Sequence, residues 1–136
     1  MSFPFAAKHG PILVDAEVTG PSRRLTLALI LDTGATTSLF KESVLLALGY
    51  DLASVTDRVP MTTGSVVTSV PRVVLTRLTA LGQHRFGIPV LAHTLPTTVS
   101  VSGLLGLDFL RDRVLTIDFR AGQRFFVRKN LSLAKR

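Results

Sequence analysis

The fold is decided by ten residues in the first third of the chain, Leu29-Ile30-Leu31-Asp32-Thr33-Gly34-Ala35-Thr36-Thr37-Ser38. In this stretch an acidic residue, Asp32, directly follows an apolar strand. Burying a carboxylate without a partner is costly, so Asp32 needs a reason to stand there. Gly34 permits a tight turn and a close approach of the backbone. The hydroxyl-bearing residues that follow offer donors around the carboxylate, which makes this turn the first candidate for chemistry.

A purely structural interpretation of the same residues is available. The Asp32 carboxylate can bond the backbone of its own turn, and Ser38 can cap a helix over residues 39–48. Because Asp-Thr-Gly is short enough to occur by chance, these three residues taken alone favour the structural interpretation. The context in the rest of the chain decides between the two.

A second motif lies further along the chain, at Val101-Ser102-Gly103-Leu104-Leu105-Gly106-Leu107-Asp108-Phe109-Leu110. It reads as an apolar strand broken by glycine that runs into a short helix beginning near Gly103 or Gly106. Asp108 is then expected near the helix N-terminus, stabilised by the helix dipole and backbone N–H groups. Between the two motifs, residues 58–78 read as a long hairpin with its tip at 62–65. The two motifs in this order, with a hairpin between them, are far more specific than either alone.

The remaining sequence predicts a mainly-β protein with two short helices. Threonine and valine are abundant, while glutamate and lysine are few, and this mixture favours strands over helices. The expected strands cover residues 11–20, 25–31, 85–91, 114–119 and 124–127. With 136 residues the chain is long enough for one hydrophobic core. We expect a single domain over residues 1–136, with its core at about 11–127 and a tail at 129–136.

With these two motifs and the hairpin between them, the chain resembles the retropepsin-like aspartic proteases, in particular the small cellular and bacterial members such as the DNA-damage-inducible retropepsin-like proteins. The resemblance extends over residues 11–127. It implies an acid-protease β-barrel with one lobe per chain. Such proteases set two Asp-Thr/Ser-Gly turns face to face, and this chain carries one. The resemblance therefore implies a symmetric homodimer in which Asp32 and its twin form the catalytic pair.

The resemblance also implies roles for the neighbouring residues. Thr33 would reach across to the turn of the second copy, and Gly34 would leave room for the carboxylates. Ala35 completes the active-site turn, and residues 106–110 would form a helix that backs it. Residues that would contact substrate are Thr36 and Thr37 on the cleft floor, Thr63, Gly64 and Ser65 in a flap over residues 62–66, and Leu104 and Leu105 in side-chain pockets.

The implied activity is that of an aspartic endopeptidase acting on polypeptides. One ionised Asp32 would act as general base on a water molecule, and the protonated twin would polarise the scissile carbonyl. This chemistry needs no metal and no cofactor, and it predicts a bell-shaped pH profile on the acid side. The alternative from another class is a non-catalytic dimerising or peptide-binding β-domain of the same fold.

Composition excludes several other functions. The net charge of +7 raises the possibility of nucleic-acid binding, but no basic helical stripe accompanies it, so a solvated basic surface is the preferred interpretation. The chain has no cysteine, and its histidines lack metal-ligand spacing. No apolar run approaches the roughly 20 residues that cross a bilayer, and no signal peptide is recognisable. These features predict no membrane segment in this chain and favour a cytoplasmic location.

Overall fold

The computed structural model describes residues 2–5, 10–94 and 100–128, and strands dominate these residues. The strands are β1 (Ser2–Pro4), β2 (Leu13–Thr19), β3 (Arg24–Leu31), β4 (Leu39–Lys41), β5 (Arg58–Thr63), β6 (Val66–Ala80), β7 (Gln83–His93), β8 (Gly103–Leu105), β9 (Arg113–Asp118) and β10 (Gln123–Arg128). Two short helices, α1 (Glu42–Ala47) and α2 (Leu107–Leu110), and one 3₁₀ turn at Leu52–Ser54 interrupt them. The predicted mainly-β fold with two short helices is confirmed.

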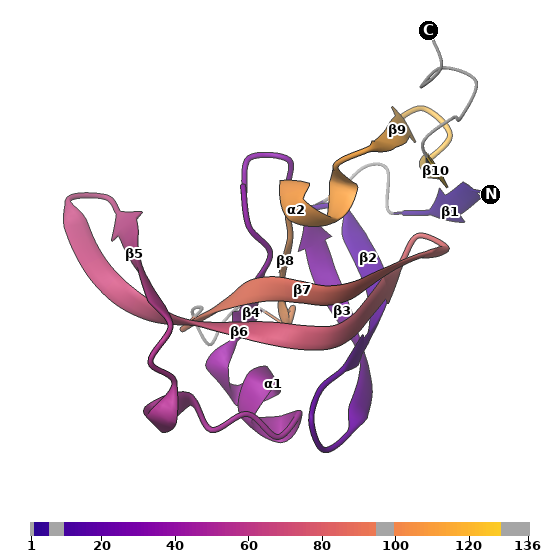
Figure 1. Cartoon of the computed structure of the whole chain (residues 1–136). Helices are drawn as coiled ribbons and strands as arrows, with labels where there is room; N and C mark the ends of the chain where they lie inside the picture. Colours follow the sequence, from indigo (N-terminus) through magenta and orange to yellow (C-terminus); the bar gives the residue numbers. More distant parts are fainter. Residues whose placement is uncertain (1, 6–9, 95–99, 129–136) are drawn as a thin grey trace, which may run out of the picture.

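Six strands close into a barrel. The larger sheet has the order β2-β3-β8-β4-β7-β6-β5, and an additional pairing of β2 with β6 joins its two sides. Strand β5 pairs with β6 outside this closed ring. Figure 1 shows β6 and β7 crossing in front of β2 and β3, with α1 at one end of the barrel and α2 at the other.

The first hairpin follows directly from the apolar alternation in the sequence. Val14, Ala16 and Val18 of β2 point into the core, while the intervening positions are exposed or half-buried. Strand β3 pairs with β2 antiparallel, with Ala16 opposite Leu27. Because side chains alternate between the two faces of a strand, this register places the apolar side of β2 inside the barrel.

The long hairpin is formed by β5 and β6, with Gly64 and Ser65 at its tip. Gly64 has a φ of 61°, the left-handed conformation that glycine adopts without strain. At the base, Pro71 pairs with Arg58, and the next residue, Arg72, already pairs with Leu91 of β7. Proline therefore lies where β6 exchanges one partner strand for another, as expected for a residue that lacks an N–H group. Figure 1 shows this hairpin projecting from the barrel on the side away from the chain termini.

The predicted helix over residues 39–48 is partly wrong. Residues Leu39–Lys41 form strand β4, which pairs with both β7 and β8, and the helix covers only Glu42–Ala47. Its N-cap residue is Lys41. Ser38 therefore does not cap a helix, because the strand that follows it is held by two neighbours distant in sequence.

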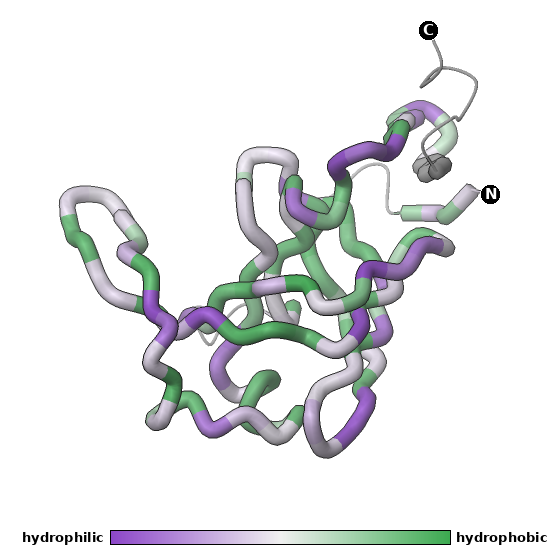
Figure 2. Tube along the Cα trace, viewed as in Figure 1, coloured by the Kyte–Doolittle hydropathy of each residue, from purple (hydrophilic) through white to green (hydrophobic). Residues whose placement is uncertain are grey.

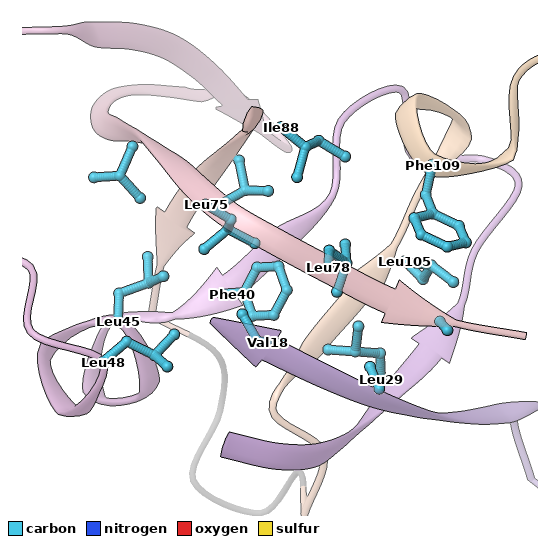
Figure 3. Packing of buried hydrophobic residues seen from close by; sticks show 14 of the residues in the cluster. Val18, Leu29, Phe40, Leu45, Leu48, Leu75, Leu78, Ile88, Leu105 and Phe109 are labelled. Carbon is cyan, nitrogen blue, oxygen red and sulfur yellow. The ribbon is translucent and has the colours of Figure 1, made fainter. Parts of the chain in front are cut away.

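The core lies inside the barrel and beneath α1 and α2. Phe40, Leu45 and Leu48 pack at the α1 end, while Leu105 and Phe109 pack at the α2 end (Figure 3). Burial of such side chains contributes roughly 1.5–3 kcal/mol each. In Figure 2 the barrel strands carry much of the hydrophobic colour, while the turn beside α2 is pale.

A second sheet, in the order β1-β10-β9, joins the two ends of the chain. Its β9–β10 hairpin matches the predicted strands, but β1 was not predicted, because its partner residues 123–125 lie at the opposite end of the sequence. Figure 1 shows this sheet standing beside the barrel rather than within it. Phe119 next to it is 62% exposed and contacts Phe5 edge to face.

No helix in the described part of the chain is long and apolar enough to span a bilayer. The predicted tail at residues 129–136 lies outside the described residues.

Candidate active site

The Asp32 turn begins where β3 ends. The backbone N–H of Asp32 still donates to the Leu105 carbonyl of β8, at 3.0 Å, and the chain then turns, with the Ala35 N–H donating to the Asp32 carbonyl at 3.2 Å. The N–H of Gly34 donates to Oδ1 of the Asp32 carboxylate at 2.9 Å. The predicted bond between the carboxylate and its own turn is therefore present. It fixes the carboxylate at the end of a rigid strand pair.

The turn presents one face to solvent. Thr33, Gly34 and Thr36 are exposed, and Asp32 and Ala35 are half-buried. A Cβ added at Gly34 would lie 3.2 Å from Asp32 Oδ1, which is tighter than ordinary contact. Glycine here keeps space open beside the carboxylate. The carboxylate is thus held but not enclosed, as a group that meets another molecule must be.

Helix α2 supports the turn from behind. The N–H groups of Leu107 and Asp108 donate to the carbonyls of Ala35 and Thr36, at 2.8 and 3.1 Å. A Cβ at Gly106 would lie 2.6 Å from the Ala35 carbonyl oxygen, so only glycine permits this approach. In Figure 1 the loop that follows β3 rises directly beside α2. The two motifs singled out in the sequence therefore meet in space.

A buried side-chain network joins the same two motifs. Ser38, fully buried, donates its hydroxyl to Oδ1 of Asp108 at 2.6 Å, and its N–H to Oδ2 at 2.8 Å. The Ser38 hydroxyl also accepts the N–H of Gly106 at 2.9 Å, and Asp108 Oδ1 accepts the N–H of Phe109 at 2.9 Å. Asp108 was expected near a helix N-terminus with backbone donors, and it lies there. Nothing in the sequence indicated that Asp108 would pair with Ser38.

The two leucines predicted to line side-chain pockets have different positions. Leu105 is 0% exposed and belongs to the barrel core, so it does not line a pocket. Leu104, on the other face of β8, is half-buried and lies opposite Ile30 and Leu39. The prediction for Leu105 is wrong because successive residues of a strand face opposite sides.

The remaining predicted substrate contacts divide between two places. Thr37, half-buried, and Thr36 lie in the Asp32 turn. Thr63, Gly64 and Ser65 are exposed at the tip of the β5–β6 hairpin. Figure 1 shows this tip standing apart from the turn. In a single chain the Asp32 turn, β8 and α2 therefore lie together, and the hairpin tip lies apart from them.

Among the described residues, no group of three or more His, Cys, Asp or Glu side chains could hold a metal ion. A hollow of about 430 Å³ lies between β1 and the first hairpin, and another of about 580 Å³ lies beside the β2–β3 turn, and neither is lined by Asp32.

Comparison with known proteins agrees with this geometry. A family model described as aspartyl protease matches residues 14–109, which include the Asp32 turn and α2. A crystal structure of a retropepsin-like aspartic protease from Rickettsia conorii matches with a TM-score of 0.69 and 18% sequence identity, covering 93% of this chain and 91% of that one. A search of curated proteins finds no match.

The chain belongs to the aspartyl protease family, and its fold is that of the retropepsin-like proteases. The resemblance drawn from the sequence is confirmed. Family and fold together support a protease function.

Proposed function

We propose that this protein is an aspartic endopeptidase that is active as a symmetric homodimer, with Asp32 of each copy as the catalytic residue. The observation that carries the proposal is the Asp32 carboxylate itself. It stands on an exposed turn, is oriented by the Gly34 N–H, and is supported from behind by α2. A carboxylate fixed in this way and left open on one face is arranged for reaction rather than for stabilising the fold.

The need for a second copy follows from chemistry and chain length. A water molecule is activated by one ionised carboxylate together with one protonated carboxyl group, and each chain supplies one Asp-Thr-Gly turn. A two-fold axis beside the exposed residues of the turn would bring the two groups together in an isologous interface. Thr33, exposed next to Asp32, is then placed to contact the second turn. The β1-β10-β9 sheet offers further surface for the pairing.

The reaction is hydrolysis without a covalent enzyme intermediate. The ionised carboxylate takes a proton from water as the hydroxyl attacks the scissile carbonyl carbon. The protonated carboxyl donates its proton to the carbonyl oxygen. Collapse of the tetrahedral intermediate breaks the C–N bond: the carboxyl group that took the proton from water gives it to the leaving amine, and the other carboxylate takes the proton of one hydroxyl of the intermediate. The products are one carboxylic acid and one amine, and no metal or cofactor takes part.

The hairpin of β5 and β6 is proposed as the flap that closes over the peptide. Residues 62–69 are exposed in the single chain, and Gly64 is in the left-handed conformation at the tip. A projecting, weakly packed hairpin is free to move toward a bound substrate. Thr63, Gly64 and Ser65 would then contact the substrate from above, and Thr36 and Thr37 from below.

The Asp32→Asn variant tests the proposal. Asparagine keeps the shape of the side chain but can neither accept the proton nor share it, so cleavage of a peptide library between pH 3 and pH 7 should be abolished. A pepstatin-type inhibitor should block the wild-type protein. Undiminished cleavage by the Asn variant would refute the proposal. A folded wild-type dimer that cleaves nothing across this range would favour the alternative, a non-catalytic peptide-binding domain.

A further inference from the structure

An arginine lies on the inner face of the barrel wall near α2. Arg85 of β7 is paired with Leu78 of β6, and the Leu78 side chain is 0% exposed. Opposed residues in a β-ladder share a face, so the Arg85 side chain starts on the inner side. The next residue, Phe86, is 72% exposed on the outer side.

The direction of Arg85 depends on a local change in the alternation of β7. Beyond Gly87, the buried positions are Ile88, Val90 and Ala92, which are even-numbered, whereas Arg85 is odd-numbered. Gly87 has a φ of 60°, which is incompatible with a regular strand and inverts the alternation there. The glycine thus turns inward a cation that a regular strand would place outside.

The Arg85 guanidinium binds the end of α2. Its Nε and Nη2 donate to the carbonyl of Phe109 at 3.1 and 2.9 Å, and Nη2 also donates to the carbonyl of Arg111. The same group lies 5.9 Å from the centre of the Phe109 ring. The last carbonyls of a helix have no partners within the helix, and a planar fork of donors can satisfy two of them at once. Burial lowers the pKa of Arg85 and the nearby Arg113 lowers it further, while Asp112 and Asp108 raise it.

Helix α2 is therefore held at both ends. Its first N–H groups bind the carbonyls of Ala35 and Thr36 in the Asp32 turn, and its last carbonyls bind Arg85. A four-residue helix has too little internal bonding to fix its own position. The segment after it enters β9 through Asp112, whose φ of 62° is unusual for a residue other than glycine. Without Arg85, the helix would keep its bonds to the turn and the packing of Phe109 in the core, but its C-terminal carbonyls would lose the bonds that hold that end.

We propose that Arg85 is a positioning residue for the active site: through α2 it sets the orientation of the Asp32 turn. This role rests on the proposed peptidase function. Arg85 does not reach the reacting atoms, and its effect passes through backbone bonds of Leu107 and Asp108. Displacing a catalytic group by about 1 Å can cost a hundredfold in rate, so a modest tilt of α2 is enough to matter.

The test compares Arg85→Gln and Arg85→Lys with Arg77→Gln. Arg77 lies on the adjoining strand, is half-buried, and donates to Glu17 at 2.9 Å rather than to α2. The first measurement is the ¹H–¹⁵N spectrum of each folded protein. In Arg85→Gln the amide signals of Gly34, Ala35, Leu107 and Asp108 should shift, and in Arg77→Gln they should stay in place.

The second measurement is peptide cleavage at protein concentrations that keep the dimer formed. For Arg85→Gln we expect kcat to fall at least about tenfold with KM within about twofold, since the turn is displaced but the binding surface remains. Arg85→Lys keeps the charge but not the fork of donors, so it should recover part of kcat. Arg77→Gln should keep the wild-type kcat. If Arg85→Gln does not fold, the amide shifts and the kcat of Arg85→Lys decide whether Arg85 positions the turn.

Two results would overturn the proposal: unchanged amide signals in the Asp32 turn of the Arg85 variants, or an equal loss of kcat in Arg77→Gln. Should the wild-type protein cleave no peptide, the proposed function fails, while the amide shifts still decide whether Arg85 positions the turn.

Discussion

The hydroxyl and N–H of Ser38 are both bound to the carboxylate of Asp108, a residue 70 positions further along the chain, at 2.6 and 2.8 Å. This pair closes a ring of bonds around the Asp32 turn, because Ser38 ends the turn and Asp108 belongs to the helix that supports it. The fully buried Ser38 hydroxyl also accepts the Gly106 N–H. Two groups, the Asp108 carboxylate and the Gly106 N–H, thus depend on one small side chain.

Replacing Ser38 by alanine should therefore destabilise the protein strongly for such a small change. The variant leaves the buried Gly106 N–H without an acceptor and removes one bond to a charged group, which together cost about 2–3 kcal/mol. Urea denaturation measures the free energy of unfolding. Ser43→Ala, at an exposed position of α1, is the matched control and should change it by less than about 0.5 kcal/mol. If Ser38→Ala and Ser43→Ala changed the free energy of unfolding equally, the hydrogen bonds assigned to the Ser38 side chain would be contradicted.

Gly106→Ala should disturb the contact between α2 and the turn by overpacking. The added methyl would lie 2.6 Å from the Ala35 carbonyl oxygen and 3.0 Å from the Thr37 carbonyl carbon, both of which are backbone. Because backbone cannot rotate away, we expect a loss of about 1–3 kcal/mol in stability and a lower kcat. Thermal unfolding and peptide cleavage check the two parts. A variant with wild-type stability would show that the helix does not approach the turn this closely.

The base of the β5–β6 hairpin should respond to acid. Arg72 donates to both carboxylate oxygens of Asp57, at 2.9 and 3.0 Å, and this hydrogen bonding lowers the pKa of Asp57 from its ordinary value of 3.8. A lowered folded-state pKa means that the pair contributes stability above the ordinary value, and that the contribution is lost as the pH falls through the folded value.

An NMR titration of the Asp57 carboxyl at low salt measures this directly, since salt screens an exposed pair. The midpoint should lie below 3.8 in the wild-type protein and rise in Arg72→Gln. At pH 6 the variant should be slightly less stable than the wild-type protein, and the difference should vanish at the acid end of the titration. A midpoint that does not move would show that the ion pair is not formed in solution.

The hairpin tip should become protected when a substrate analogue binds. In the single chain the tip residues are exposed, so their amides should exchange rapidly compared with those of β2 and β3. With a pepstatin-type inhibitor bound, exchange at residues 62–66 should slow by about tenfold or more if the hairpin is a flap. The turn at Gly82, at the other end of β6, is the internal control. Unchanged exchange at the tip, with the inhibitor bound, would exclude a flap role.

Much of this arrangement can be predicted from local sequence, and the rest depends on contacts between distant segments. The alternation in β2 and the acid–glycine turn at Asp32 are local signals, and both were identified correctly. The helix proposed to start after Ser38 was displaced because β4 is held by β7 and β8. The sequence also does not show which residue of β8 faces the core, since Leu104 and Leu105 are equally apolar.

Two features gave no signal in the sequence. Strand β1 pairs with residues near the other end of the chain, and a three-residue segment has no pattern of its own. Arg85 looks like any scattered surface charge until Gly87 inverts the alternation of β7 and turns the side chain toward α2. The structural role of such a glycine or charged residue depends on the residues that pack beside it in the fold, and the local sequence does not show these.

The proposed mechanism requires two copies of this chain to bring their Asp32 side chains together. A crystal structure of the protein in its active oligomeric form measures the separation of the two carboxyl groups directly. We expect a two-fold dimer with these groups about 3 Å apart. A protein that stays monomeric at every concentration and pH tested, or a dimer that holds the two carboxyl groups far apart, would contradict it.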